Sequence, residues 1–157
     1  MKRIFLLAVC CFFVVGCAST KYHQAKKVTK YGYFDSQFQD NIYDVQFKAN
    51  SYSRGLDAYD YTLLRSCEVC LENGYKSFDI VKQNNYTTKS SYVQSNAYGN
   101  AYYASGQAYN VVSYYPYYEF RIECFKEKNG YYDAEQIRNN LIKKHNIKKL
   151  KKKYNLK

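Results

Sequence analysis

An uninterrupted apolar run from Ile4 to Val15 follows two basic residues and lies just ahead of Cys17. A basic start followed by an apolar stretch is typical of a secretory signal peptide. The run is 12 residues long, whereas a stable membrane-spanning helix needs about 20. We therefore expect no permanent transmembrane helix here, and we exclude residues 1–16 from the folded domain as a signal that is removed.

The end of this signal is Val14-Val15-Gly16-Cys17, where an ordinary signal peptide carries a small-x-small site. The four residues resemble a lipobox. The resemblance implies a diacylglycerol thioether on Cys17, cleavage in front of it, and a further acyl chain such as palmitate on the new N-terminus. One acyl chain anchors only marginally, at about 0.8 kcal/mol per buried CH₂, so three chains hold a protein essentially permanently. The alternative is a generic signal peptide or a short core helix.

The segment after Cys17 is polar and basic up to Lys30 and has no periodicity. Residues 17–30 are therefore predicted to be a lipidated N-terminus and a flexible tether, with a reach of roughly 20 Å. Ala18 follows the lipidated cysteine, whereas aspartate is the usual inner-membrane retention signal in enteric-type sorting. We expect an outer-membrane protein that faces the periplasm, with the inner membrane as the alternative.

The formal charge of +11 is concentrated at the C-terminus, because residues 143–157 contain eight lysines and no acidic residue. Lys2 and Arg3 leave with the signal, so the body between carries only +1. A uniformly basic nucleic-acid-binding face is not what this distribution describes. An exported protein also has little access to nucleic acid, so we expect no nucleic-acid partner.

Apolar and polar residues alternate over Ile42–Ala49, which predicts a half-buried strand. Asp57 fits the N-cap of a following helix, which Gly74 ends. Ser77–Val81 then predicts a second strand. The apolar face of the helix is expected to consist of Leu63, Leu64, Cys67, Cys70 and Leu71.

The stretch Gln83–Asn110 is rich in Tyr, Ser, Asn, Gly and Ala and has almost no aliphatic residue. It has little with which to fill a core. We therefore expect residues 83–110 to be an insertion, either a mobile loop or a long exposed hairpin.

A third strand is expected after Pro116, with alternating residues up to Cys124. Asp133 and Gln136 fit a capping box for a last helix that ends near Asn146. The predicted fold is α+β, a small β-α-β-β-α domain over residues 31–142. It has a three-stranded mixed sheet, with the first two strands parallel through a right-handed crossover and both helices on one face. The Lys-rich tail, residues 143–157, is expected to project.

Three segments resemble a proteobacterial family of small uncharacterised lipoproteins typed by two Caulobacter open reading frames. They are Tyr31-Gly32-Tyr33-Phe34-Asp35, then Tyr43 to Asn50, then Leu63 to Glu68 with the helix end at Asn73-Gly74-Tyr75. The resemblance covers about residues 31–82. It implies the same lipid-anchored location and the same general plan of the fold, and the family has no established activity or catalytic residue.

Cys67 and Cys70 have the C-x-x-C spacing of redox and zinc sites. In redox folds such a pair lies at a helix N-terminus, which lowers the thiol pKa, but here it lies past the middle of a predicted helix. A zinc site needs about four ligands, and only Cys124 could join. We expect buried packing residues, with a disulfide from Cys124 to Cys67 or Cys70 as the alternative. No metal or cofactor is expected.

The two histidines, His23 and His145, lie in the tether and near the tail, outside the predicted body of the domain. No base is therefore placed for a catalytic triad. Glu68 and Glu72 could pair as catalytic carboxylates, but on an exposed helix face they are more often solvated. Arg65 and Glu68 are expected to form a weak surface ion pair.

These observations favour a membrane-anchored, non-enzymatic envelope lipoprotein that acts as a binding or structural module. Its tyrosines could bind a protein or glycan, and its tail could contact an anionic lipid or wall polymer. The lysines expected at that anionic surface are Lys148, Lys149, Lys151, Lys152 and Lys153. The alternative is an accessory wall- or glycan-processing enzyme that uses carboxylates.

Overall fold

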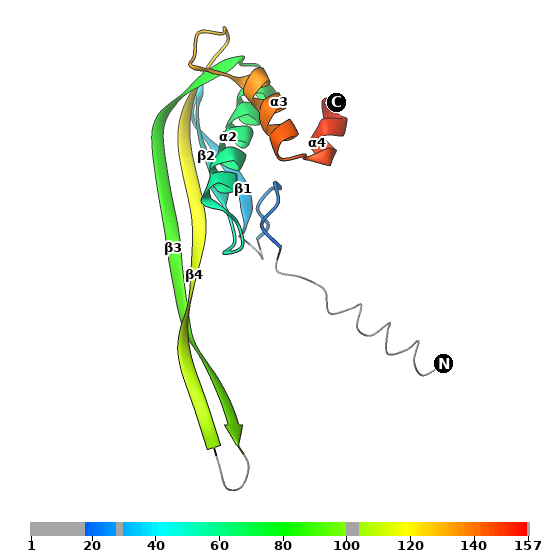
Figure 1. Cartoon of the computed structure of the whole chain (residues 1–157). Helices are drawn as coiled ribbons and strands as arrows, with labels where there is room; N and C mark the ends of the chain where they lie inside the picture. The colour runs from blue at the N-terminus through cyan, green and yellow to red at the C-terminus, as the bar shows by residue number, and fades with distance from the viewer. Residues whose placement is uncertain (1–17, 28–29, 100–103, 157) are drawn as a thin grey trace, which may run out of the picture.

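The computed structural model describes residues 18–27, 30–99 and 104–156. Over these residues the fold is α+β, as predicted, with three helices and a five-stranded open sheet of order β1-β2-β4-β3-β5 (Figure 1). Within the described residues, no helix combines the length and the apolar character that crossing a membrane requires. In chain order the elements are β1 (Gly32–Gln39), β2 (Ile42–Lys48), α2 (Gly55–Glu72), β3 (Ser77–Gly99), β4 (Ala104–Phe125), β5 (Tyr132–Asp133), α3 (Ala134–Lys144) and α4 (Lys148–Lys153).

The prediction of a three-stranded mixed sheet is wrong, because every neighbouring pair of strands is antiparallel. β2 and β3 do run in the same direction, as the crossover through α2 requires. However, β4 lies between them and pairs antiparallel with both. The crossover therefore skips one strand position, and no parallel pair forms.

Strand β1 was not predicted because it lies at an edge of the sheet and lacks a clear apolar alternation. Its two phenylalanines, Phe34 and Phe38, are 56% and 52% exposed. It pairs along its length with β2. Strand β5 has only two residues, which is too short for a periodic pattern to reveal.

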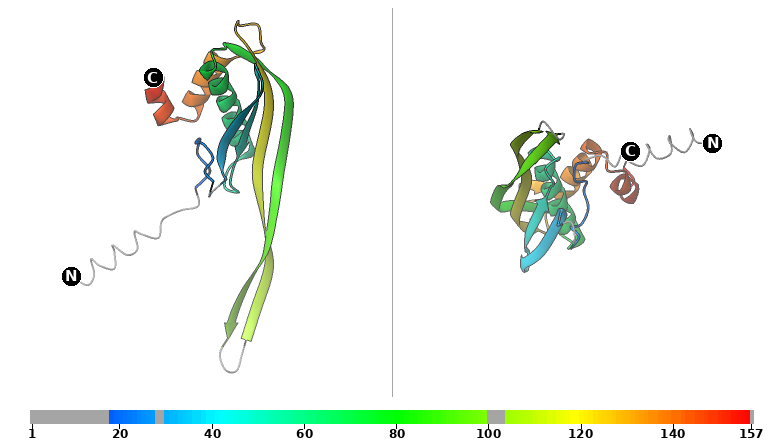
Figure 2. Two further views of the ribbon diagram at one scale, coloured as in Figure 1. Left: turned by 180° about the vertical axis from the view of Figure 1, so that it is seen from behind. Right: turned by 90° about the horizontal axis from the view of Figure 1, so that it is seen from below.

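The core lies between the sheet and helix α2. The side chains of Val45 and Phe47 on β2, and of Phe120 and Ile122 on β4, are fully buried. The predicted apolar face of α2 packs on them, and Leu64 is fully buried there. Helices α2 and α3 cover the same face of the sheet, as predicted (Figures 1 and 2).

The predicted N-cap residue is confirmed for α3 and is wrong for α2. Asp133 caps α3, accepting a hydrogen bond of 3.0 Å from the backbone N–H of Gln136. In α2 the N-cap is Arg54, not Asp57. Asp57 instead accepts two hydrogen bonds, of 2.9 and 2.7 Å, from the Arg54 guanidinium.

The described part of the predicted tether differs from expectation, because residues 18–25 pack against the domain. Thr20 is buried, and the backbone of Tyr33 pairs with His23 and Ala25 through hydrogen bonds of 2.9 and 2.8 Å. Gly32, with a φ of 115°, makes this close approach. A Cβ atom there would lie 2.4 Å from the carbonyl oxygen of His23.

The Lys-rich tail also differs from expectation, because it folds back instead of projecting. Its short helix α4 buries Leu150, which is 9% exposed, in the main core cluster. Ile147 and Tyr154 pack there as well. These three apolar residues lie on a different helix face from the apolar residues of α3. The turn at Asn146, which has a positive φ of 47°, redirects the chain and lets α4 bury that face.

Strands β3 and β4 continue far beyond the rest of the sheet as a two-stranded hairpin (Figures 1 and 2). Of the two expectations for residues 83–110, a mobile loop or an exposed hairpin, the structure has the hairpin. The last hydrogen bond that ties β4 to the β2 side runs from Ala49 N–H to the Pro116 carbonyl oxygen, at 2.9 Å. We call residues 87–99 and 104–116 the ribbon. Thirteen residues per strand extend it about 40 Å from the body.

Candidate functional site

Cys67, Cys70 and Cys124 are buried and free, and Cys17 lies outside the described residues. Cys70 donates a hydrogen bond of 3.3 Å to the Ser77 carbonyl oxygen. A hydrogen bond with Cys70, together with burial, raises the pKa of Cys124 far above its ordinary value. Burial raises the pKa of Cys67 in the same way. Neutral, buried thiols are poor nucleophiles, and no metal-binding group of three or more His, Cys, Asp or Glu occurs within the described residues.

Glu68 is buried, with 3% of its side chain exposed, whereas a solvated position on a helix face was predicted. Its carboxylate accepts hydrogen bonds from the hydroxyl of Tyr22 and, at 3.1 Å, from the hydroxyl of Tyr154. Arg65 lies 3.6 Å from the same carboxylate. One side chain of α2 therefore binds both the N-terminal segment and the C-terminal tail.

Arg65 joins this cluster to β1, so it is not the isolated surface pair that was predicted. It forms ion pairs of 2.8 Å with Asp35 and 3.0 Å with Glu72. Burial lowers the pKa of Arg65, but the hydrogen bonds and charge of Asp35 outweigh it and keep the pKa above its ordinary value. The pKa of Tyr22 is raised by burial and then by the charge of Glu68. Arg65 is therefore charged and Tyr22 is neutral at physiological pH.

The Glu68 cluster borders a cleft of about 380 Å³ between the N-terminal segment, α2 and α4. Glu68 and Glu72 both line it, together with Lys149 and Lys153. Among the described residues, every buried side-chain nitrogen and oxygen has a hydrogen-bond partner. Since Arg65 already holds both carboxylates, the cleft resembles a structural junction more than a prepared acid–base pair.

His145 was predicted to lie outside the body of the domain, and the structure corrects this. Its side chain is only 9% exposed, and its Nε2 lies 2.7 Å from Oδ2 of Asp60, which is also buried. The ring packs 4.8 Å from the ring of Tyr61. The pair fixes the end of α3 to the first turns of α2. Oδ2 of Asp60 also forms an ion pair of 2.6 Å with Lys144, so its partners belong to a structural contact between the two helices.

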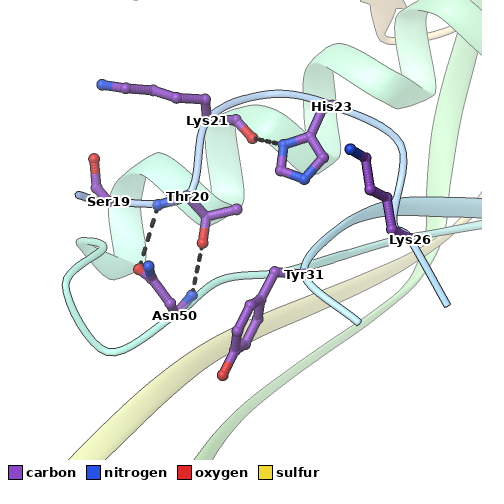
Figure 3. Close-up of a pocket in the computed structure, with 7 residues that line it drawn as sticks. All are labelled: Ser19, Thr20, Lys21, His23, Lys26, Tyr31 and Asn50. Carbon is purple, nitrogen blue, oxygen red and sulfur yellow. Dashed lines mark hydrogen bonds between the residues drawn. The ribbon is translucent and has the colours of Figure 1, made fainter. Parts of the chain in front are cut away.

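A shallow hollow of about 490 Å³ lies beside the N-terminal segment (Figure 3). Thr20 and Asn50, which both line it, are joined by two hydrogen bonds in which the backbone N–H of each donates to the side-chain oxygen of the other, at 3.3 and 2.9 Å. His23 lies at its rim, with Nδ1 2.7 Å from the carbonyl oxygen of Lys21. These contacts attach the segment to the turn after β2.

The ribbon has two different faces, because side chains alternate along each strand. One face continues the helix-covered side of the sheet and carries Tyr114, Val112 and Asn110 of β4. The opposite face, which we call the outer face, carries a row of tyrosines from both strands. The described members of that row in the ribbon are Tyr92, Tyr109 and Tyr115, and Tyr86 and Tyr117 continue the row onto the body.

The tyrosines of the outer face are exposed toward the tip, and near the body they contact other rings. Tyr92 is 55% and Tyr109 46% exposed. Tyr86 and Tyr117 pack with ring centroids 5.7 Å apart. Burial, and then the charge of Glu119, raise the pKa of Tyr117 to about 12, so its hydroxyl stays protonated. Such rings offer large apolar contact area with a polar tip.

The ribbon is also nearly uncharged. From residue 83 to residue 116 the only charged side chain is Lys89. The ribbon contacts the body at its base, where the rings of Tyr31 and Tyr115 stack with centroids 6.2 Å apart. Further out its described side chains are mostly exposed, so this nearly neutral, aromatic hairpin adds little to the stability of the body. It is suited to contact with a protein or with the apolar faces of sugar rings.

Comparison of the chain with protein-family models, with curated proteins and with solved structures found no match.

Proposed function

We propose that this chain is a non-enzymatic envelope lipoprotein whose ribbon binds another envelope component. Acylated Cys17 anchors it to the outer membrane, facing the periplasm, and the likeness of residues 31–82 to the lipoprotein family belongs to the same proposal. One observation carries the binding role, namely that the ribbon leaves the body with Tyr92 and Tyr109 exposed on one face. A hairpin that serves only folding has no reason to extend this far without a packing partner.

Site-specific photocrosslinking tests the ribbon. We expect p-benzoylphenylalanine at position 92, in place of Tyr92, to give a discrete crosslinked species in intact cells. The matched control is the same replacement of Tyr131, which is 85% exposed but lies in the turn before β5. Absence of an adduct from position 92, or identical adducts from both positions, would contradict the proposal.

The exposed lysines of α4 supply a second contact, with an anionic lipid or glycan surface. Lys148, Lys149, Lys152 and Lys153 are exposed, and Lys151 is half-buried. Lys153 is shared with Glu72 at 4.0 Å and with the Tyr154 ring. Each Lys near an anionic surface adds about 1 kcal/mol. Because α4 packs on the body, these charges are held together on one side of the domain.

Replacing Lys148, Lys149 and Lys152 by glutamine is expected to weaken binding to phosphatidylglycerol vesicles about 100-fold at low salt. Co-sedimentation of the full chain measures this. The matched control removes three exposed lysines elsewhere: Lys82, Lys89 and Lys126. An equal loss in both triple variants would show that net charge, and not the α4 cluster, governs the binding.

The alternative function, an accessory wall- or glycan-processing enzyme, is favoured by the two carboxylates in one cleft. Glu68 and Glu72 are the candidates. The ion pairs with Arg65 weigh against it, since both acids are already neutralised. Release of fragments from purified cell wall by the native chain, abolished in Glu72→Gln, would establish the enzyme and displace the binding role.

A further inference from the structure

The outer edge of β4 in the ribbon carries a regular row of unpaired backbone groups. Backbone groups in an antiparallel strand point alternately to its two neighbours. The Pro116 carbonyl oxygen points away from β3, since it accepts from Ala49. The N–H and C=O groups of every second residue from there toward the tip therefore face the free edge. These residues are Tyr114, Val112, Asn110, Ala108 and Gly106.

The two edges of the ribbon are protected to different degrees. β5 pairs with β3 only at Ser77 and Phe78, so the rest of that edge is free as well. However, the β3 edge carries Lys82 and Lys89, and Lys89 lies near the middle of its free length. Charged residues are a common device against pairing between edges. The β4 edge has no charge, no bulge and no proline between residues 104 and 115, so it is the edge left open to another strand.

The sequence of this edge is complementary to itself. The five outward-facing residues are centred on Asn110, so a two-fold axis at Asn110 pairs all of them in an antiparallel register. Val112 then lies opposite Ala108 of a second copy on one face. On the outer face Tyr109 lies opposite Val111 of that copy, an aromatic and β-branched pairing that stabilises sheets. No like charges meet, because this stretch has none.

The length of the ribbon fits the same arrangement. In this register residue 104 of one chain lies opposite residue 116 of the other. The described strand 104–116 of each copy therefore overlaps that of its partner along its full length. Five hydrogen-bonded residues on each side give up to ten backbone hydrogen bonds, and the two hairpins become one four-stranded ribbon with a continuous outer face of tyrosines.

We propose that two copies of this chain associate through the β4 edges of their ribbons, about a two-fold axis at Asn110. The proposal rests on the proposed function in taking the ribbon as the interaction surface. It adds that a second copy occupies the edge, which leaves the outer face free for the other envelope component. Self-association and partner binding are then separate properties of one element.

Cysteine crosslinking of the purified full chain in detergent tests the register. In Asn110→Cys the two new thiols meet across the axis with Cα atoms about 5.5 Å apart, within disulfide range. The matched control is Val93→Cys, since Val93 pairs with Asn110 within the hairpin and is 67% exposed. Its two copies would lie three strand spacings apart, about 14 Å. The unaltered chain, with its buried thiols, gives the background.

We expect mild oxidation to convert at least tenfold more Asn110→Cys than Val93→Cys to covalent dimer. Equal yields from the two variants, or no dimer from Asn110→Cys, would overturn the proposal. Since both positions are exposed on the ribbon, far-ultraviolet circular dichroism should match the unaltered chain in each case.

A second pair of variants removes the need for a disulfide. Asn110→Lys places two like charges at the axis, and Val93→Lys places the same charge one strand away. Analytical ultracentrifugation should show at least a tenfold weaker dimer for Asn110→Lys only, and a monomeric unaltered chain would overturn the proposal. If self-association fails while position 92 still crosslinks to another protein, the proposed function stands without this inference. If the chain self-associates but position 92 gives no crosslinked species, this inference stands and the proposed binding of another envelope component fails.

Discussion

Replacing Glu68 by alanine is expected to lower the free energy of unfolding by about 3 kcal/mol, a large part of the total for a domain of this size. The variant leaves the hydroxyls of Tyr22 and Tyr154 without their acceptor and removes one carboxylate from Arg65. Unpaired polar groups in a buried site cost about 1–3 kcal/mol each. Urea unfolding measures the change, and the melting temperature should fall by about 10 °C.

The control is Glu72→Ala, one helical turn further along α2. Glu72 also pairs with Arg65, but its side chain is 44% exposed. Partly exposed pairs contribute about 1 kcal/mol or less. Equal and small losses in the two variants would show that Glu68 does not join the N-terminal segment and the tail to the body.

Replacing Cys17 by serine is expected to abolish lipidation completely, because a hydroxyl does not replace the thiol that forms the thioether. Metabolic labelling with an alkyne analogue of palmitate should mark the native chain and leave Cys17→Ser unlabelled. The variant should also keep residues 1–16 and migrate as a heavier band. Fractionation should place the native chain in the outer membrane.

The matched control is Cys11→Ser, which changes a cysteine within the apolar run of the signal. It should be labelled and processed like the native chain. Labelling that persists in Cys17→Ser would show that the acyl chains are attached to another residue. Recovery of the native chain entirely in the inner membrane would contradict the inference from Ala18.

The parts of the fold that the sequence predicts correctly are those with a strong periodic pattern. The alternation around Val45 and Phe120 and the apolar face of α2 all pack as expected, because one buried face fixes the pattern. Asp133 caps α3 as predicted. Strand β1 was not predicted, because a partly exposed strand at the edge of a sheet does not require alternating apolar and polar residues. The order of the sheet was missed because β4 comes late in the chain and still inserts beside β2.

The buried polar contacts could not be predicted, because they join residues far apart in the chain. Glu68 meets Tyr22 and Tyr154, which lie 46 and 86 positions away. His145 meets Asp60 across 85 positions. Each of these residues looks solvated in its own segment. The only local signal was the position of Glu68 between Cys67 and Cys70, inside the apolar stretch of the helix.

For the ribbon the sequence left two alternatives open, a mobile loop and a long exposed hairpin. Its composition excludes a packed core, but composition alone does not set the register of two strands. The tight pairing from Tyr86 with Tyr117 outward continues the register that the body establishes. Tyrosines that looked scattered in the sequence therefore gather on one face.

Capture of a partner by a chain without its ribbon tests the central claim most directly. Residues 88–115 are replaced by Asn-Gly, which joins Thr87 to Pro116, two residues that already face each other. A melting temperature within about 3 °C of the native value confirms that the body remains folded. After chemical crosslinking in intact cells, this chain should recover less than a tenth of the partner that the native chain recovers. Undiminished recovery from a folded, membrane-attached chain would contradict the account and place the binding surface on the body.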